Sequence, residues 1–181
     1  MIENIETRIA TNEDIDKIAI KEGQKMSNIV LDFKGEKIDK TKFLDLFNRL
    51  QQVKGLQKVE LDLTKFPLDS EQVDLVNKFF KNLDDLKEIY VHVSETKFDD
   101  SLFDRLLNES LSGKKSIEKI HLVMENVNMC DTKRRSIEKL VNSLPSLRNV
   151  HINMQRNNMT KEELADLHRL IFHFPHRVLL W

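Results

Sequence analysis

The feature that most constrains this chain is a segment of about 30 residues that recurs along it. Four copies align as "LQKVELDLTKF", "LKEIYVHVSETKF", "IEKIHLVMENVNM" and "LRNVHINMQRNNM". Their first apolar residues, Leu56, Leu86, Ile117 and Leu147, are spaced 30, 31 and 30 residues apart. "NIVLDFKGEKI", which begins at Asn28, fits the same frame. Constant spacing of this kind predicts stacked repeats, each of which buries its apolar face against its neighbours.

Each copy has two parts with different periodicity. The first part alternates apolar and polar residues, as in Val59, Leu61 and Leu63, which is typical of a half-buried strand of about six residues. The second part carries apolar residues at helical spacing over about fourteen residues, as in Val73, Val76 and Phe80. We expect these helices to begin near capping residues, for which Ser70, Asp131 and Thr160 are the candidates.

The strands are apolar on one face only, and this decides between two kinds of α/β fold. A doubly wound sheet is covered by helices on both faces, so its strands would be apolar on both. The sequence therefore predicts a single-sided α/β solenoid over residues 26–181, with a parallel sheet on the concave face, helices on the convex face and about five to six repeats. "FPHRVLL" repeats the proline of "LPSLRNV" 30 residues later and predicts a short last strand at Val178–Trp181.

The repeated pattern L-x-x-L-x-L, as in Leu56, Val59 and Leu61, resembles that of leucine-rich repeat proteins of the ribonuclease-inhibitor-like class. The chain departs from the family pattern where an asparagine usually follows the strand, so the repeats are divergent. The residues at that position are Thr64, Ser94, Glu125 and Gln155. The resemblance implies a curved solenoid that binds partners, commonly on the concave sheet face, and it implies no chemistry.

Residues 1–25 do not fit the repeat. "NEDIDKIAI" is consistent with a short helix or strand, and the end of a solenoid needs a cap because it otherwise exposes core. We expect residues 1–25 to be an N-terminal cap; a partner-binding arm is the alternative.

Composition and motifs exclude several function classes. The net charge of −1 provides no basic field for nucleic acid, and no apolar run approaches the roughly 20 residues that cross a bilayer. The chain has four glycines and lacks G-x-G-x-x-G and Walker A motifs, which argues against nucleotide cofactors. A single cysteine, Cys130, permits no internal disulfide and favours a reducing, intracellular and cytoplasmic location. We expect no enzyme activity, no cofactor and no small-molecule substrate.

The polar face of the strands is the candidate binding surface. Equivalent positions of neighbouring parallel strands form rows across a sheet, which we call ladders. The residues expected to contact a partner lie in two adjacent ladders and are Glu60, Asp62, Tyr90, His92, His121, His151 and Asn153. The frame makes His121 and His151 neighbours, with His92 diagonal to them.

Three imidazoles in one place allow more than one interpretation. Zinc binds histidine nitrogens, but parallel neighbours point the same way and no fourth ligand is evident. An exposed sheet face that is polar without further role, and a protein-contact patch, are the two main alternatives. In a protein interface, protonation of these rings would weaken binding near pH 6.

Three further features are weaker candidates. "KRR" at Lys133 is expected to be a solvated helix face rather than a nucleic-acid site. Cys130 precedes a helix start, where Asp131 opposes activation of the thiol. Trp181 ends an apolar segment that either closes the core or docks, at the sheet edge, to another subunit.

The sequence thus favours a non-catalytic interaction subunit of a larger assembly, whose partners are other protein subunits. The alternative is a small monomeric adaptor or regulator that binds one soluble partner transiently. A subunit isolated from its assembly should expose a large apolar patch, whereas a transient adaptor should not.

Overall fold

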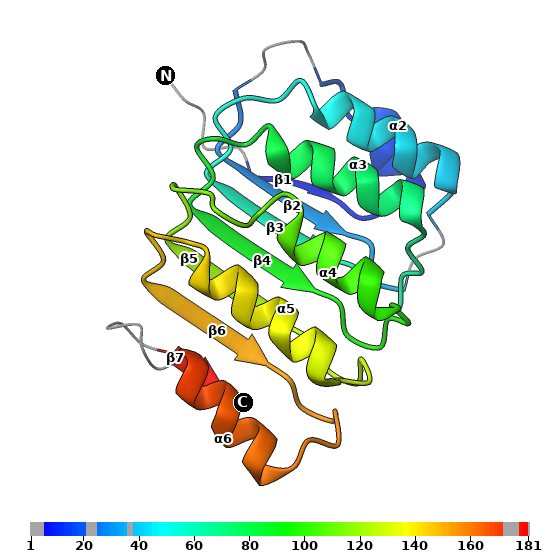
Figure 1. The fold of residues 1–181 in the computed structure, drawn as a ribbon. Coiled ribbons are helices and arrows are strands. Elements are labelled where there is room, and N and C mark those ends of the chain that lie inside the picture. The colour runs from blue at the N-terminus through cyan, green and yellow to red at the C-terminus, as the bar shows by residue number, and fades with distance from the viewer. Residues whose placement is uncertain (1–5, 21–24, 36–37, 172–177, 181) are drawn as a thin grey trace.

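The structure is a computed structural model that describes residues 6–20, 25–35, 38–171 and 178–180. Seven strands form one parallel sheet in the order of the sequence: β1 Glu6–Ile9, β2 Asn28–Asp32, β3 Lys58–Asp62, β4 Glu88–His92, β5 Lys119–Val123, β6 Asn149–Asn153 and β7 Val178–Leu180. The labelled helices all cover the same face of that sheet (Figure 1). The single-sided α/β solenoid expected from the sequence is therefore confirmed.

The helices alternate with the strands along the chain. Their bounds are α1 Asn12–Lys17, α2 Lys40–Leu50, α3 Ser70–Lys81, α4 Asp100–Asn108, α5 Asp131–Asn142 and α6 Lys161–Ile171. Packed helices lie about 8–10 Å apart and strands about 4.8 Å apart, so the helix layer takes the longer arc and the sheet lies on the concave side.

Helices α1 to α4 begin at capping side chains, and two of the three candidates from the sequence lie one residue from the observed N-cap. The side chain of Asp69, rather than Ser70, accepts the capping hydrogen bond of α3. Cys130, rather than Asp131, stands at the N-cap of α5 and makes no side-chain capping bond. Thr160 and Glu163 exchange hydrogen bonds at the start of α6, so the prediction at Thr160 is confirmed.

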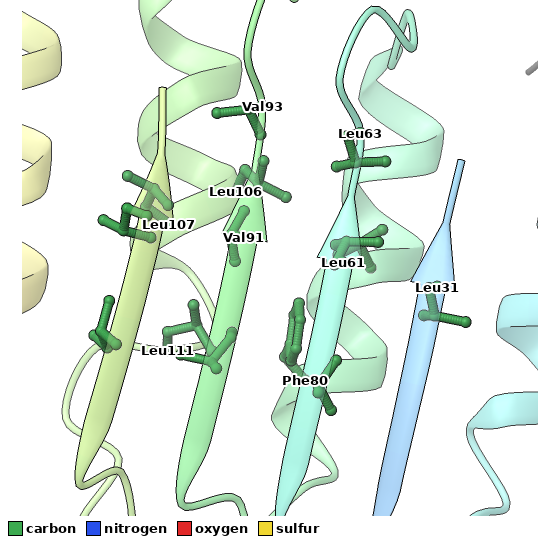
Figure 2. Close-up of a cluster of buried hydrophobic side chains, with 14 of the residues drawn as sticks. Leu31, Leu61, Leu63, Phe80, Val91, Val93, Leu106, Leu107 and Leu111 are labelled. Carbon is green, nitrogen blue, oxygen red and sulfur yellow. The ribbon is translucent and has the colours of Figure 1, made fainter. Parts of the chain in front are cut away.

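The core lies between the sheet and the helices. In β2 to β5 the residues alternate between half-buried and fully buried, as the period-two pattern predicts. Figure 2 shows Leu61 and Val91 of neighbouring strands beside Phe80 and Leu106, which come from α3 and α4. Ladders of strand residues therefore pack on rows of helix residues without a break between repeats, as in other repeat proteins.

The strands are one residue shorter than expected, but sheet pairing continues past their ends. The Leu63 N–H donates to the His92 carbonyl and the Val93 N–H donates to the Val123 carbonyl, at 2.7 and 2.9 Å. In the turn after each of five strands, one residue has a positive φ angle, between 52° and 63°. These residues are Gly35, Lys65, Glu95, Asn126 and Arg156. The same turn conformation thus recurs in five repeats, including four copies in which the residue is not glycine.

Two buried polar side chains, Thr96 and Asn157, occupy equivalent turn positions that the sequence frame did not assign. Asn157 donates to the carbonyls of Met124 and Met154 at 2.6 and 2.8 Å, and it accepts from the Val127 N–H at 2.9 Å. Thr96, at the equivalent place in the β4 repeat, donates to the Leu63 carbonyl at 2.9 Å. These side chains satisfy backbone groups in buried turns, which would otherwise be costly.

The segment before the repeats continues the strand–helix alternation in a shorter form. β1 pairs in parallel with β2, and Ile9 and Ile15 are buried. Arg49 of α2 donates to the carbonyls of Ile15 and Ile18 at 2.8 and 2.7 Å, which ties the end of α1 to the first full repeat. The sheet thus begins before residue 26.

The far edge of the sheet is formed by the short last strand that the segment "FPHRVLL" predicts. β7 pairs in parallel with β6, with His151 opposite Leu179. Trp181, expected either to close the core or to dock to another subunit, lies outside the described residues.

Replacement of Asn157 by alanine tests the role of this side chain in the buried turns. The variant leaves two carbonyls and one N–H without their partner, so the free energy of unfolding should fall by about 3 kcal/mol. Urea denaturation followed by circular dichroism measures the change. Asn149→Ala, at an exposed position on β6, is the matched control and should change stability by less than about 0.5 kcal/mol. Equal effects of the two substitutions would contradict the role of Asn157.

Candidate functional site

The candidate site is the sheet face opposite the helices, which we call the open face. The register pairs Glu60 with Tyr90, Tyr90 with His121 and His121 with His151, and in the next ladder Asp62 with His92. Both ladders expected from the sequence are therefore confirmed. Each of the seven predicted contact residues is half-buried, as residues flanked by neighbouring ladders should be.

Carboxylates gather at the N-terminal end of the open face. Asp32 forms an ion pair with Arg8 of β1, and Asp62 lies 3.7 Å from Nδ1 of His92. Burial raises the pKa of the Asp62 carboxyl, but the neighbouring His92 ring and the hydrogen bond from the Thr64 N–H, at 2.9 Å, outweigh it and hold that pKa below its usual value. Asp62 is therefore an ionised acceptor at neutral pH.

Tyr90 lies at the centre of the open face among charged groups. Its hydroxyl donates to Oε2 of Glu88 at 3.0 Å. The ammonium groups of Lys58 and Lys119 lie 4.9 and 5.0 Å from the centre of its ring, within the range of cation–π attraction. Lys119 also lies 3.6 Å from the same Glu88 carboxylate oxygen. These contacts hold the Tyr90 ring in one orientation from several sides.

The histidines lie beside Tyr90 in a continuous row of rings. His121 and His151 stack, with ring centres 4.1 Å apart and planes inclined by 19°, while Tyr90 and His92 lie 5.4 and 5.7 Å from His121. Burial, followed by the positive fields of His151, His92 and Lys119, lowers the pKa of His121 from 6.5 to about 4. In the unbound protein, His121 therefore does not titrate near pH 6, and the expected weakening of binding near that pH cannot arise from its protonation.

The arrangement of the three histidines also bears on the zinc interpretation. The His121 and His151 rings lie face to face rather than converging on a point. Within the parts of the chain that the structure describes, no group of three or more His, Cys, Asp or Glu side chains is placed to hold a metal ion. Asn153, at the end of the second ladder, donates to Glu125 at 2.8 Å and lies outside the histidine stack.

The structure corrects one of the weaker candidates and locates another. Lys133 of the "KRR" cluster is buried rather than solvated, and its ammonium donates to the carbonyls of Val127 and Asn128 at 2.9 and 3.3 Å. Lys133 is thus a structural residue that fastens a turn. The Cys130 thiol lies 3.3 Å from a carboxylate oxygen of Asp100.

The site contains three residues that the sequence did not single out. They lie in the ladder that flanks Tyr90 and are Lys58, Glu88 and Lys119. Their role became visible only from the convergence of both ammonium groups on one ring. Arg8 lies before the first recognisable repeat, so the frame gave no position for it.

Two clefts of the described surface lie away from the open face. One of about 250 Å³ lies between α5 and α6, lined by Arg134, Glu138 and Asp166 among others. One of about 550 Å³ lies beside the turns that follow β2 and β3. Neither includes a residue of the open face, so that face is not the lining of either cleft.

Comparisons with known proteins support the fold and go no further. No protein-family model matches the chain, and no curated protein matches its sequence. The solved structure of a tropomodulin C-terminal domain from Caenorhabditis elegans is similar, with a TM-score of 0.54, 13% sequence identity and coverage of 89% of each chain. None of the described helices is long and apolar enough to span a bilayer. The chain thus shares a solenoid fold of the leucine-rich repeat type with that tropomodulin domain.

The depressed pKa of His121 predicts a pH dependence of stability. The unfolded chain takes up a proton at this residue below pH 6.5 and the folded chain only near pH 4, so stability is lost as pH falls through this range. Because the ring is partly exposed, solvent screening limits the loss to about 1 kcal/mol.

Urea denaturation of the wild type and His121→Gln between pH 8 and pH 4.5 measures this loss. The difference in unfolding free energy between the two proteins should be constant above pH 7 and should shrink by about 1 kcal/mol at pH 4.5. Parallel curves over the whole range would show that His121 titrates normally.

Proposed function

We propose that this chain is a non-catalytic protein-binding module whose partner contacts the open face. The observation that carries the proposal is the row formed by Tyr90, His121 and His151 on a sheet face that the described helices leave uncovered. Tyrosine and histidine rings combine apolar contact area with hydrogen-bonding groups, as recognition surfaces require. Stacking and cation–π contacts already fix these rings, so little side-chain entropy is lost on binding.

The described surface favours reversible binding over a permanent place in an assembly. Leu164, which is 39% exposed, is the one large apolar side chain that is exposed within residues 7–20, 25–35 and 38–169, for which the structure describes side-chain burial. A subunit of an obligate assembly would present a larger apolar patch when alone. Of the two forms expected from the sequence, the adaptor or regulator that binds one soluble partner transiently is therefore the one that we propose.

A catalytic role lacks an arranged nucleophile on the open face. Ser94, the hydroxyl nearest along the chain to His92, is buried, and its oxygen accepts from the Glu125 N–H at 3.1 Å. It thus serves the turn between two repeats rather than a histidine base, whereas hydrolytic catalysis would need a nucleophile in contact with an oriented base.

We further propose that the segment before residue 26 acts as a cap. β1 occupies the edge of the sheet, and α1 places Ile15 in the core. The ion pair between Lys42 and Asp16, at 2.5 Å, joins α1 to the first full repeat on its outer side. These contacts cover the first repeat, as solenoid ends require.

Site-specific photocrosslinking in the native cell tests the binding face. A benzophenone amino acid placed at Tyr90 or at His151 should yield the same adduct with one partner. The matched control is the same amino acid at Lys78, an exposed residue on α3 of the opposite face, which should yield no such adduct.

Adducts formed from Lys78 but not from Tyr90 or His151 would overturn the open face as the binding surface. The proposed transient mode adds a second requirement for the purified chain. In light scattering it should be a monomer of 21.4 kDa, and the partner should dissociate from it on dilution.

A further inference from the structure

The open face is electrically asymmetric. Its β2–β3 half carries three carboxylates, Asp32, Glu60 and Asp62. The outward residues of β4 to β6 include a single carboxylate, Glu88, together with Lys119, Tyr90 and three histidines. Lys58 belongs to β3, but its ammonium lies over the Tyr90 ring and adds its charge to the second half.

The positive groups of this second half are only partly neutralised. Oε2 of Glu88 already accepts from the Tyr90 hydroxyl and lies 3.6 Å from Lys119. Lys58 is in contact with the face of Tyr90, and it is in no ion pair with the described carboxylates. Around the Tyr90 ring, Glu88 therefore pairs with Lys119 and leaves the Lys58 ammonium without an ion pair among the described carboxylates.

The stacked imidazoles extend this surface with groups that donate to anions. His121 and His151 lie in the ladder next to Lys119, and Asn149 and Val123 on either side are uncharged. An anion above Tyr90 and His121 would meet two ammonium groups and imidazole N–H groups. The opposing charges are Glu88 and, on the β3 side, Glu60, which is the ladder partner of Tyr90.

We propose that the half of the open face formed by Lys58, Tyr90, Lys119, His121 and His151 binds a carboxylate-rich segment of a partner protein. The inference rests on the proposed function and names the chemistry of the partner. Complementary charge of this kind fixes which partner binds and in which orientation, more than it adds raw affinity. The three carboxylates of the β2–β3 half repel the same segment, so it is confined to β4–β6.

This binding is linked to proton uptake. In the free protein, burial, His151, His92 and Lys119 hold the pKa of His121 near 4, with Glu88 the nearby negative group on β4. A bound carboxylate favours the protonated ring and raises that pKa. Affinity for the acidic segment therefore rises as pH falls from 8 to 5.5, the opposite of the weakening expected from the sequence alone.

Fluorescence anisotropy with the full chain tests the proposal. The probe is a fluorescein-labelled dodecapeptide of alternating glutamate and serine, and its control has glutamine in place of glutamate. The glutamate peptide should bind about 10-fold more tightly than the control, and about 5-fold more tightly at pH 5.5 than at pH 8.

Two double variants locate the binding. Lys58→Gln with Lys119→Gln should weaken binding of the glutamate peptide about 10-fold, and His121→Gln with His151→Gln should remove its pH dependence. The matched control, Lys78→Gln with Lys161→Gln, makes the same charge change on the helices and should leave affinity unchanged.

Equal affinity for the two peptides, or an equal loss in the helix variant, would overturn the proposal. So would tighter binding of a twelve-residue oligothymidylate, because the surface would then be a general anion or nucleic-acid site. If a partner still crosslinks to Tyr90 after such a result, the open face remains the proposed binding surface. Only the proposal that the partner's segment is rich in carboxylates would then be wrong.

Discussion

The fold depends on register between neighbouring repeats. Each parallel strand pairs residue for residue with the next, and pairing continues beyond the strands through bonds such as the Lys65 N–H to the Ser94 carbonyl at 3.0 Å. Before the strands, the Gln57 carbonyl accepts from the N–H groups of both Lys87 and Glu88. Because side chains alternate along a strand, a slip of one residue would turn every core residue of a repeat outward. A near-constant period of 30 residues is what prevents such a slip.

The same register brings together the residues of the proposed binding surface. A residue on the open face does not pack in the core, so its type can differ from strand to strand. The register nevertheless determines which residues lie beside it. Tyr90, His121 and His151 belong to three repeats that are 30 or 31 residues apart, yet their rings are in contact. The asymmetry of charge between β2–β3 and β4–β6 likewise arises from sequence differences between copies of one repeat. The residues that recur in each repeat thus build the core, and the residues that differ between repeats form the proposed binding surface.

Much of this structure follows from the repeat frame in the sequence. The strands, their order, the two ladders and the contact of His92 with His121 all follow from the period and the alternation, because both are properties of the backbone. The frame failed where side chains act across repeats. It drew attention to Gln155 after the strand rather than to Asn157, whose four hydrogen bonds reach two repeats. It also treated Lys133 as solvated, since the carbonyls that bind its ammonium lie in a turn whose shape no periodicity reveals.

The central claim is that one face of the sheet is core and the other is available to a partner, and accessibility along β5 tests it most directly. Single cysteines would be placed at each position from Lys119 to Val123 in a Cys130→Ser background, and their rates of reaction with a thiol reagent compared. The account predicts fast reaction at Lys119, His121 and Val123, and reaction on the order of 100-fold slower at Ile120 and Leu122, which are 0% and 1% exposed. Rates that do not alternate along the strand would contradict the one-sided sheet.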